Sequence, residues 1–347
     1  MNFGSCTTAV CYYHHLAIAN DNRTNENPSA VENYSSAYAA LVAVQIFYGT
    51  LPVAGKVVLA HIPALALVGF RVGITALVLV TFQTIRGRIW LAEKGDYWRF
   101  AALCVFGVLL NQYLFIGGLA LTRASNASIL AVTIPVFTLL ISVLFRYEKL
   151  YLLKVLGVAL AAAGVIFLID PRKASFESST TQGDIMMVLN SLAFGIYVAI
   201  SKDIISRNGP FRSMMWVFIF SSIVAVPVGA LSLSTVDLAQ VPTPVWALIA
   251  YIGVGATAAP YLLNAYAVTR VRPSTVAIFI YLQPIIGVVL AGIFLHEQMG
   301  PSFVVASLLV FAGLFLATRR NAATRLAEGS VAEGSVAEGR VAEGRTK

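Results

Sequence analysis

Charged residues are scarce in this chain. Lys, Arg, Asp and Glu make up only 12% of its 347 residues, whereas hydrophobic residues make up 58%. A water-soluble domain carries about a quarter of its residues as charges. The mean hydropathy of +0.80 points the same way. These values exclude an ordinary soluble domain and predict a protein that crosses a membrane several times.

Cysteines and catalytic motifs are also few. The three cysteines lack the spacing of a metal site or a disulfide framework, and the pair His14-His15 has no further ligand near it in sequence. The segment GTLPVAGKV, which starts at Gly49, resembles a phosphate-binding loop, but its glycines stand one residue too far apart. The sequence therefore predicts no enzyme, no cofactor and no metal.

Long apolar segments are abundant instead. Each is about as long as an α-helix must be to cross a hydrocarbon core of ~30 Å. The ten segments cover 37–59, 64–85, 97–119, 125–146, 150–169, 183–204, 212–234, 244–266, 275–296 and 302–318. We expect an all-α integral membrane protein with ten transmembrane helices in contact with the lipid bilayer. Residues 1–36 are expected to form a disordered cytoplasmic tail, and 320–347 a low-complexity tail built on a VAEG repeat.

The distribution of positive charge predicts the orientation. The formal net charge is +8, but the basic residues stand singly or in pairs between apolar segments, which excludes a nucleic-acid-binding patch. Of the 24 Lys and Arg residues, 19 fall on the connections and tails of one side and four on the other side. By the positive-inside rule, both termini are expected in the cytoplasm of a cell whose plasma or bacterial inner membrane holds the protein.

Two proline-to-glutamate segments mark similar halves of the chain. Pro135 precedes Glu148 by thirteen residues, and Pro284 precedes Glu297 by the same distance. The two segments lie 149 residues apart, and a glycine follows each glutamate sixteen residues later. This repeated spacing of proline, glutamate and glycine predicts an internal duplication.

Other matches keep an offset of 146 to 149 residues. A glycine stands seven residues before a lysine at Gly49 and again at Gly195, and a Thr-Arg pair occurs at 122–123 and at 269–270. We therefore expect two five-helix repeats, over 37–170 and 183–319. Five is an odd number, so the second repeat must cross the membrane in the opposite direction. Such inverted repeats are typical of secondary transporters.

The order of these motifs resembles the EamA repeat of the drug/metabolite transporter superfamily. The resemblance covers roughly 37–319 and rests on the Gly-x6-Lys segment, on Arg71, on NQYLFIGGLALTRASNASILAVTIPVF from Asn111, and on YLQPIIGVVLAGIFLHEQM from Tyr281. It implies a ten-helix bundle of two inverted repeats that carries small metabolites, often outward. The second half has Val217-Phe218 in place of the arginine and lacks the Asn-Gln pair, which implies a chemically asymmetric cavity.

Arg71 is the charged residue that lies deepest in a predicted helix, some ~10–12 Å from its start. A charge at that depth is costly unless it has a partner or faces a water-filled cavity. Two kinds of role remain open. Arg71 contacts substrate or a gate, or it is structural, either bonding to carbonyls of broken helices or extending its side chain to the outer membrane interface.

Further polar residues inside the predicted helices are candidates for a substrate cavity, with helix–helix hydrogen bonds and interfacial tyrosines as the alternative. Asn111 and Gln112 are adjacent, so ~100° separates their side chains, and we expect one to face the cavity and the other a neighbouring helix. The full set comprises Arg71, Tyr48, Asn111, Gln112, Tyr113, Asn190, Tyr197, Tyr261, Asn264, Tyr281 and Gln283.

Prolines and two glutamates are expected to shape the helices. Each proline removes a backbone hydrogen bond, so Pro52, Pro135, Pro260 and Pro284 predict bends that serve as hinges or as fixed kinks. Glu148 and Glu297 lie ~20 Å from their prolines, near opposite membrane surfaces. We expect each to close a helical hairpin by accepting hydrogen bonds from free amides of the next helix, with proton coupling as the alternative.

The sequence thus predicts a secondary active transporter that exports a small polar metabolite, such as an amino acid, by alternating access. An uptake carrier or antiporter of the same fold is the first alternative. A non-transporting membrane subunit or a membrane enzyme is the second. Substrate identity, coupling and oligomeric state are left open.

Overall fold

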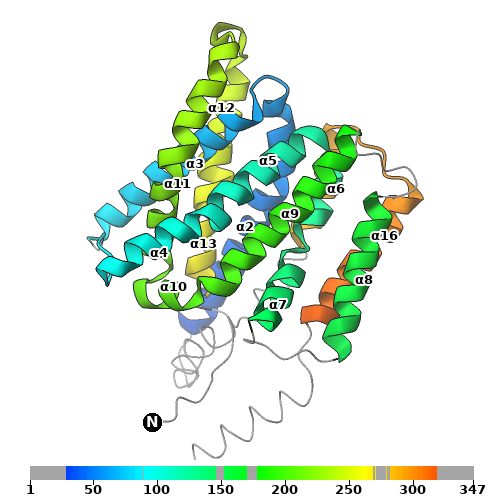
Figure 1. The fold of residues 1–347 in the computed structure, drawn as a ribbon, viewed down its shortest axis with the longest axis horizontal. Coiled ribbons are helices and arrows are strands. Elements are labelled where there is room, and N and C mark those ends of the chain that lie inside the picture. The colour runs from blue at the N-terminus through cyan, green and yellow to red at the C-terminus, as the bar shows by residue number, and fades with distance from the viewer. Residues whose placement is uncertain are drawn as a thin grey trace, which may run out of the picture.

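The computed structural model describes residues 29–87, 89–145, 152–169, 178–268, 270, 279 and 282–318. Within these residues every regular element is a helix, and Figure 1 shows the long helices packed side by side as a bundle. The all-α prediction is confirmed. The predicted positions Glu148 and Tyr281, most of the N-terminal tail and the whole C-terminal tail lie outside the described residues.

The described elements follow one another along the chain. They are α2 (Ser29–Leu59), α3 (Ala64–Ile85), α4 (Lys94–Cys104), η1 (Val105–Leu110), α5 (Asn111–Leu121), α6 (Ala124–Ala131), α7 (Ile134–Leu144), α8 (Leu152–Ile169), α9 (Ser179–Ile200), α10 (Lys202–Asn208), α11 (Pro210–Ser232), η2 (Leu233–Thr235), η3 (Leu238–Gln240), α12 (Thr243–Gly253), η4 (Val254–Ala258), α13 (Ala259–Val268), α15 (Leu282–Phe294) and α16 (Pro301–Thr318).

Eight helical segments within the described residues are long and apolar enough to cross a membrane. Two further apolar helices, over 282–294 and 301–317, are shorter. The total of ten membrane-spanning helices therefore stays a prediction. One boundary differs from expectation, because α2 begins at Ser29 and the end of the predicted tail, 29–36, is helical. Neither glycine nor proline occurs between Ser29 and Phe47, so a helix nucleated in the apolar segment extends toward the N-terminus.

Helices α3 and α11 pack with their backbones in close contact. A Cβ added to Gly69 would lie 2.9 Å from the carbonyl oxygen of Ala225, and one added to Gly229 would lie 3.1 Å from that of Leu65. Residue numbers rise along one helix as they fall along the other, so the two helices are antiparallel. Small residues permit this approach, which is how helices commonly associate in membranes.

Helices α8 and α16 form a second antiparallel pair, at one edge of the bundle in Figure 1. A Cβ on Gly157 would lie 2.7 Å from the oxygen of Gly313, and a Cβ on Gly164 would lie 2.9 Å from the oxygen of Ala306. An offset of 149 residues converts Gly157 into Ala306 and Gly164 into Gly313. The same offset therefore converts each of these two contacts into the other.

The glycines of the two Gly-x6-Lys segments make a further pair of equivalent contacts. Gly49 of α2 faces Ile286 of α15, and Gly195 of α9 faces Phe137 of α7. Ile286 follows Phe137 by 149 residues. In both places a side chain would collide with the partner helix, because the two helices approach so closely that a Cβ would have less than 3 Å of space. The recurring glycine thus has a packing reason.

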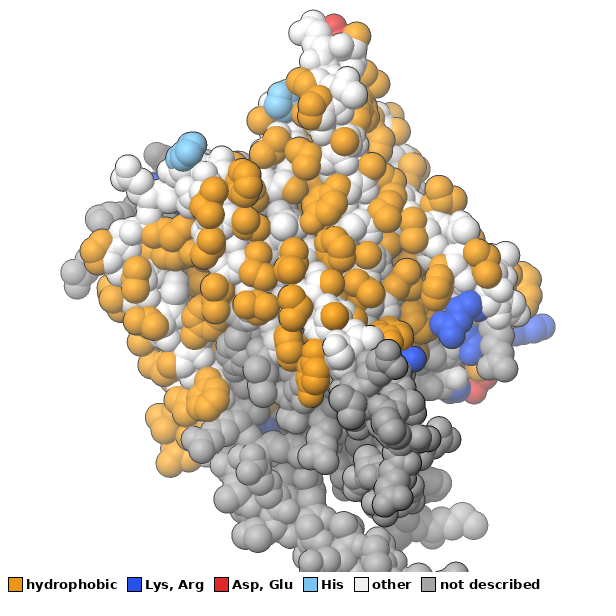
Figure 2. Space-filling model, turned by 180° about the vertical axis from the view of Figure 1, so that it is seen from behind, with side chains coloured by type: hydrophobic (Ala, Val, Ile, Leu, Met, Phe, Trp, Pro, Cys, Tyr) orange, Lys and Arg blue, Asp and Glu red, His pale blue; other side chains and the backbone are white. Residues whose placement is uncertain are grey.

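The surface of the bundle is largely apolar. Figure 2 shows hydrophobic side chains over most of the face seen from behind, with Lys and Arg gathered near its lower edge. Leucines such as Leu77, Leu152 and Leu231 expose 69%, 76% and 74% of their surface. An apolar belt of this kind suits contact with lipid hydrocarbon.

Candidate functional site

Arg71 lies in α3 and is only 5% exposed. Its Nε donates a hydrogen bond of 2.8 Å to the hydroxyl of Thr257 in η4, and its guanidinium carbon lies 5.8 Å from the ring centre of Phe115 in α5. Within the described part of the chain, no Asp or Glu forms an ion pair with Arg71, and its other N–H groups have no protein acceptor. The guanidinium is therefore held in place but not neutralised.

Tyrosines from both halves of the chain lie around this arginine. Tyr48 of α2 and Tyr261 of α13 are partly buried. Both phenols lie close enough to the Arg71 guanidinium to interact with it electrostatically. Tyr261 also packs edge-to-face on Phe218, with ring centres 5.7 Å apart. Tyr197 of α9 is 4% exposed, and its phenol lies close enough to that of Tyr261 to interact with it electrostatically. The helices thus bring together four of the predicted cavity residues.

The amides of α5 form a hydrogen-bonded group with α9. Asn111 Nδ2 donates to Asn190 Oδ1 at 2.6 Å, and Gln112 Nε2 donates to Asn111 Oδ1 at 3.2 Å. Asn111 thus bonds to a neighbouring helix, while Gln112 also reaches back to Asn111; that one of the two faces a cavity stays a prediction. Gln112 Oε1 and the Tyr113 hydroxyl are buried and have no partner among the described residues, so they can bind a guest or water.

Within the described residues, each half contains one π-helical turn, and the two turns lie in the equivalent predicted helices 97–119 and 244–266. The first is η1, directly before Asn111, and the second is η4, which ends two residues before Pro260, the second residue of α13. Because Asn111 and Pro260 are 149 residues apart, the turns are equivalent, and proline alone does not cause them. A π-turn widens the helix and often accompanies a functional site. Here one of the two turns carries Thr257, the partner of Arg71.

The other prolines differ in their effect. Pro135 follows an interruption at 132–133, so the predicted helix 125–146 is broken into α6 and α7. The hydroxyl of Ser191 donates to Leu130 O at 3.1 Å beside this break. Pro52 lies within α2, which stays a single helix, and Pro284 is buried at the third position of α15. Among the described residues, Pro135 is thus the predicted hinge or kink proline that follows an interruption between two helices.

Glu297 binds the N-terminus of α6. Its carboxylate accepts hydrogen bonds from Ala124 N (2.8 Å), Ser125 N (3.0 Å) and the Ser125 hydroxyl (2.5 Å). The sequence predicted that Glu297 accepts hydrogen bonds from free helical amides, but from those of the next helix along the chain, which is α16. That part of the prediction is wrong, because the chain folds so that α6 of the first half begins beside Glu297.

Asp184 is a buried carboxylate that the sequence-based candidates did not include. It is 2% exposed, near the start of α9. It accepts hydrogen bonds from the hydroxyl of Thr122 and from Asn126 Nδ2, the latter at 3.2 Å to each oxygen. Asp184 is the second residue of the predicted segment 183–204, so the depth that singled out Arg71 did not single it out. Asp184 and Glu297 together bracket the start of α6.

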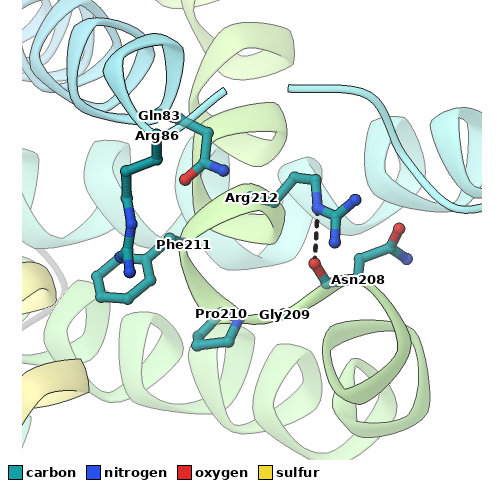
Figure 3. A pocket seen from close by; sticks show the side chains of 7 residues that line it. All are labelled: Gln83, Arg86, Asn208, Gly209, Pro210, Phe211 and Arg212. Carbon is teal, nitrogen blue, oxygen red and sulfur yellow. Dashed lines mark hydrogen bonds between the residues drawn. The ribbon is translucent and has the colours of Figure 1, made fainter. Parts of the chain in front are cut away.

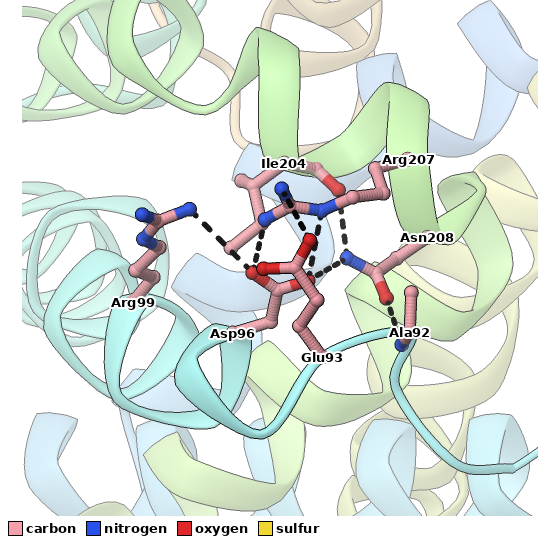
Figure 4. Close-up of polar contacts among 7 residues, drawn as sticks. All are labelled: Ala92, Glu93, Asp96, Arg99, Ile204, Arg207 and Asn208. Atoms are coloured by element: carbon pink, nitrogen blue, oxygen red, sulfur yellow. Dashed lines mark hydrogen bonds and ion pairs between the residues drawn. The ribbon is translucent and has the colours of Figure 1, made fainter.

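A second polar cluster joins the halves at the other end of the continuous helical segment 94–121 (Figure 4). Asp96 of α4 is fully buried and pairs with Arg207 of α10, which also contacts Glu93 at 3.1 Å. Asn208 Nδ2 donates to Asp96 at 2.7 Å, while Asn208 Oδ1 accepts from Ala92 N at 2.8 Å. These bonds tie the start of α4 to the α9–α11 connection.

Two predicted cavity residues take no part in these contacts. Asn264 of α13 and Gln283 of α15 are partly buried, and no side-chain hydrogen bond joins either of them to another described residue. Within the described residues no three His, Cys, Asp or Glu side chains group as metal ligands would. The polar groups that do meet offer a cation, amides and hydroxyls, which suit binding of a polar molecule.

Comparison with known proteins places these features in context. The model of the EamA-like transporter family matches this chain twice, over residues 35–170 and 181–319. The chain is 22% identical over 290 residues to the uncharacterized transporter YoaV of Bacillus subtilis, a match that covers 80% of this chain and 95% of that protein.

Two further matches are informative. A probable terminal-alkyne amino-acid exporter of Streptantibioticus cattleyicolor is 24% identical over 225 residues, covering 65% of this chain and 74% of the exporter. A protein of known crystal structure superimposes with a TM-score of 0.56 at 18% identity, over 82% of this chain and 96% of that protein. The structural match supports a shared fold.

Proposed function

Because the chain belongs to the EamA-like transporter family, we propose that it is a secondary transporter that exports small polar metabolites bearing a carboxylate, such as amino acids, across the cytoplasmic membrane. Family and relatives make it a multi-pass membrane transporter. The finer proposal rests on Arg71, a buried cation that no described carboxylate neutralises.

The chemistry around Arg71 favours a zwitterion. A guanidinium binds a carboxylate through two parallel hydrogen bonds, and the N–H groups that Thr257 leaves free are available for this. Phe115, beside Arg71, lies one helical turn from Asn111, and i, i+4 residues share a face. An ammonium or hydroxyl group of the same guest can donate to the unpartnered Gln112 Oε1.

The proposed mechanism is alternating access by two inverted five-helix repeats. It is supported by the antiparallel pairs α3–α11 and α8–α16, and by contacts that an offset of 149 residues converts into one another. Two similar halves can exchange conformations and so open the site first to one side and then to the other. The family match and the sequence contain no ATP-binding module, so an ion or solute gradient is the proposed energy source.

Flux measurements test this function. The purified protein is reconstituted in proteoliposomes with a panel of labelled amino acids and other small metabolites. R71K keeps the charge but loses the planar fork, so KM for a carboxylate substrate should rise at least about tenfold. T257V removes the acceptor of Nε and keeps the guanidinium, so its effect should be smaller. Wild-type KM in R71K would refute the role of Arg71.

Flux measurements in the same proteoliposomes also test the direction of transport and the class of protein. Flux only toward the side that holds the basic connections would indicate an uptake carrier, and flux that needs a solute on the opposite side would indicate an antiporter. Absence of flux for every compound in the panel, with folded protein, would indicate a non-transporting subunit or an enzyme.

A further inference from the structure

A pocket of about 350 Å³ lies where the end of α3 meets the α10–α11 connection. In Figure 3 its two cationic side chains, Arg86 and Arg212, come from separate helices. Arg86 follows α3 of the first half, and Arg212 lies in the first turn of α11 of the second half. The pocket thus spans the antiparallel pair that joins the halves.

Arg212 is fixed by the surrounding backbone. Its Nε donates to Asn208 O and its Nη1 donates to Trp90 O, both at 2.8 Å. Arg86 instead lies over two aromatic rings, 5.4 Å from the centre of Phe82 and 5.0 Å from that of Phe211. Among the described residues, no acid pairs with either arginine, and the guanidinium N–H groups of Arg86 have no protein acceptor.

The start of α11 adds further positive potential to the pocket. Gly209, with φ of 80°, precedes the helix and offers no side chain to cap it. The first amides of a helix lack intrahelical partners and carry a partial positive charge, which favours an anion. Asp96, which accepts a hydrogen bond from Asn208 of the pocket wall, and Glu93 are both engaged by Arg207. The pocket therefore combines positive charge with free donors.

Its position fits the membrane surface. Trp90 precedes α4 and Trp98 lies within it, and they expose 71% and 82% of their surface. Tryptophan is enriched where lipid headgroups meet hydrocarbon. Basic pockets between transmembrane helices are where anionic lipid headgroups bind.

We propose that this pocket binds a phosphate group, presented by an anionic phospholipid or by a soluble phosphate. Arg86 and Arg212 supply charge, and the backbone amides of Phe211 and Arg212 complete the site. Pro210, the first residue of α11, has no N–H, and the Ser213 amide donates to Gly209 O. Because the bound group would touch both α3 and α11, it would hold the two halves together at this end. The proposal concerns a site separate from Arg71 and stands whether or not the transport proposal holds.

Binding is tested with the full-length protein in mild detergent. Melting temperature and affinity are measured with added phosphatidylglycerol, with phosphatidylcholine, and with millimolar inorganic phosphate. Stabilisation by phosphatidylglycerol, but not by phosphatidylcholine or inorganic phosphate, is expected for a lipid site. Stabilisation by inorganic phosphate as well would assign the soluble source.

Variants link the effect to the pocket. R86Q changes an exposed side chain and should weaken the stabilising ligand at least about tenfold. R212Q should do the same, but it also removes two bonds to backbone carbonyls, so R86Q is the decisive variant. R99Q, with a side chain 64% exposed at the same end, is the matched control and should bind as the wild type does. No stabilisation by any phosphate ligand, or equal loss in R86Q and R99Q, would overturn the proposal.

Discussion

Replacing Glu297 by alanine is expected to destabilise the start of α6 by about 2 kcal/mol. The carboxylate accepts three hydrogen bonds, from Ala124 N and from the amide and hydroxyl of Ser125. Bonds to a charged group contribute about 1.5–3 kcal/mol each. Their simple sum overstates the effect, because Glu297 is only partly buried and water can replace it. Loss of a helix cap costs about 2 kcal/mol at most, and we adopt that value.

Hydrogen exchange at the start of α6 measures this effect directly. The first amides of a helix have no intrahelical partner, so protection of Ala124 and Ser125 depends on Glu297. A loss of about 2 kcal/mol corresponds to a roughly 30-fold increase in local opening. E297Q keeps one carbonyl acceptor but not the charge, so its exchange should fall between that of E297A and the wild type.

The matched control is E93Q, which removes a carboxylate whose side chain is 57% exposed and pairs with Arg207. Such an exposed pair contributes at most about 1 kcal/mol, and E93Q should leave α6 unchanged. Equal exchange at α6 in E297A, E93Q and the wild type would refute the assigned role of Glu297.

Two further substitutions test the packing of buried groups. D184A leaves the Thr122 hydroxyl without its acceptor and should lower the free energy of unfolding by about 2–4 kcal/mol, measured by thermal unfolding, with D184N less affected. G313A places a Cβ 2.6 Å from the oxygen of Gly157 and should cost about 1–3 kcal/mol, whereas G292A, whose nearest contact is the flexible end of a methionine at 3.3 Å, should be nearly neutral. Wild-type stability of D184A or G313A would contradict the packing described.

Helix positions were predictable because hydrophobic length is a local property. The predicted segment 64–85 coincides with α3, and Pro63 and Arg86 mark its two ends in the sequence. The interruption near Pro135 was also signalled, since proline removes a backbone hydrogen bond wherever it occurs in a helix. The equivalent π-turns were not predictable, because one precedes a proline and the other precedes Asn111.

Partners of polar side chains were harder to predict. Glu297 was expected to bind the next helix along the chain, yet it binds a helix whose first residue lies 173 positions earlier. The bond from Asn111 to Asn190, 79 residues away in α9, was likewise not specified by the sequence. Such errors arise where the choice depends on distances between helices that no local pattern contains.

The amino-acid sequence alone specifies an all-helical membrane protein with a repeated order of glycines, prolines and glutamates. Helical rise, hydrophobic length and proline chemistry act within one segment, so they can be read from the chain. The packed bundle was needed to show that Arg71 meets Thr257, 186 residues away, and that no described acid meets Arg71. Helix packing decides which distant polar groups share a low-dielectric interior, and there each group must find a partner or remain available to a guest.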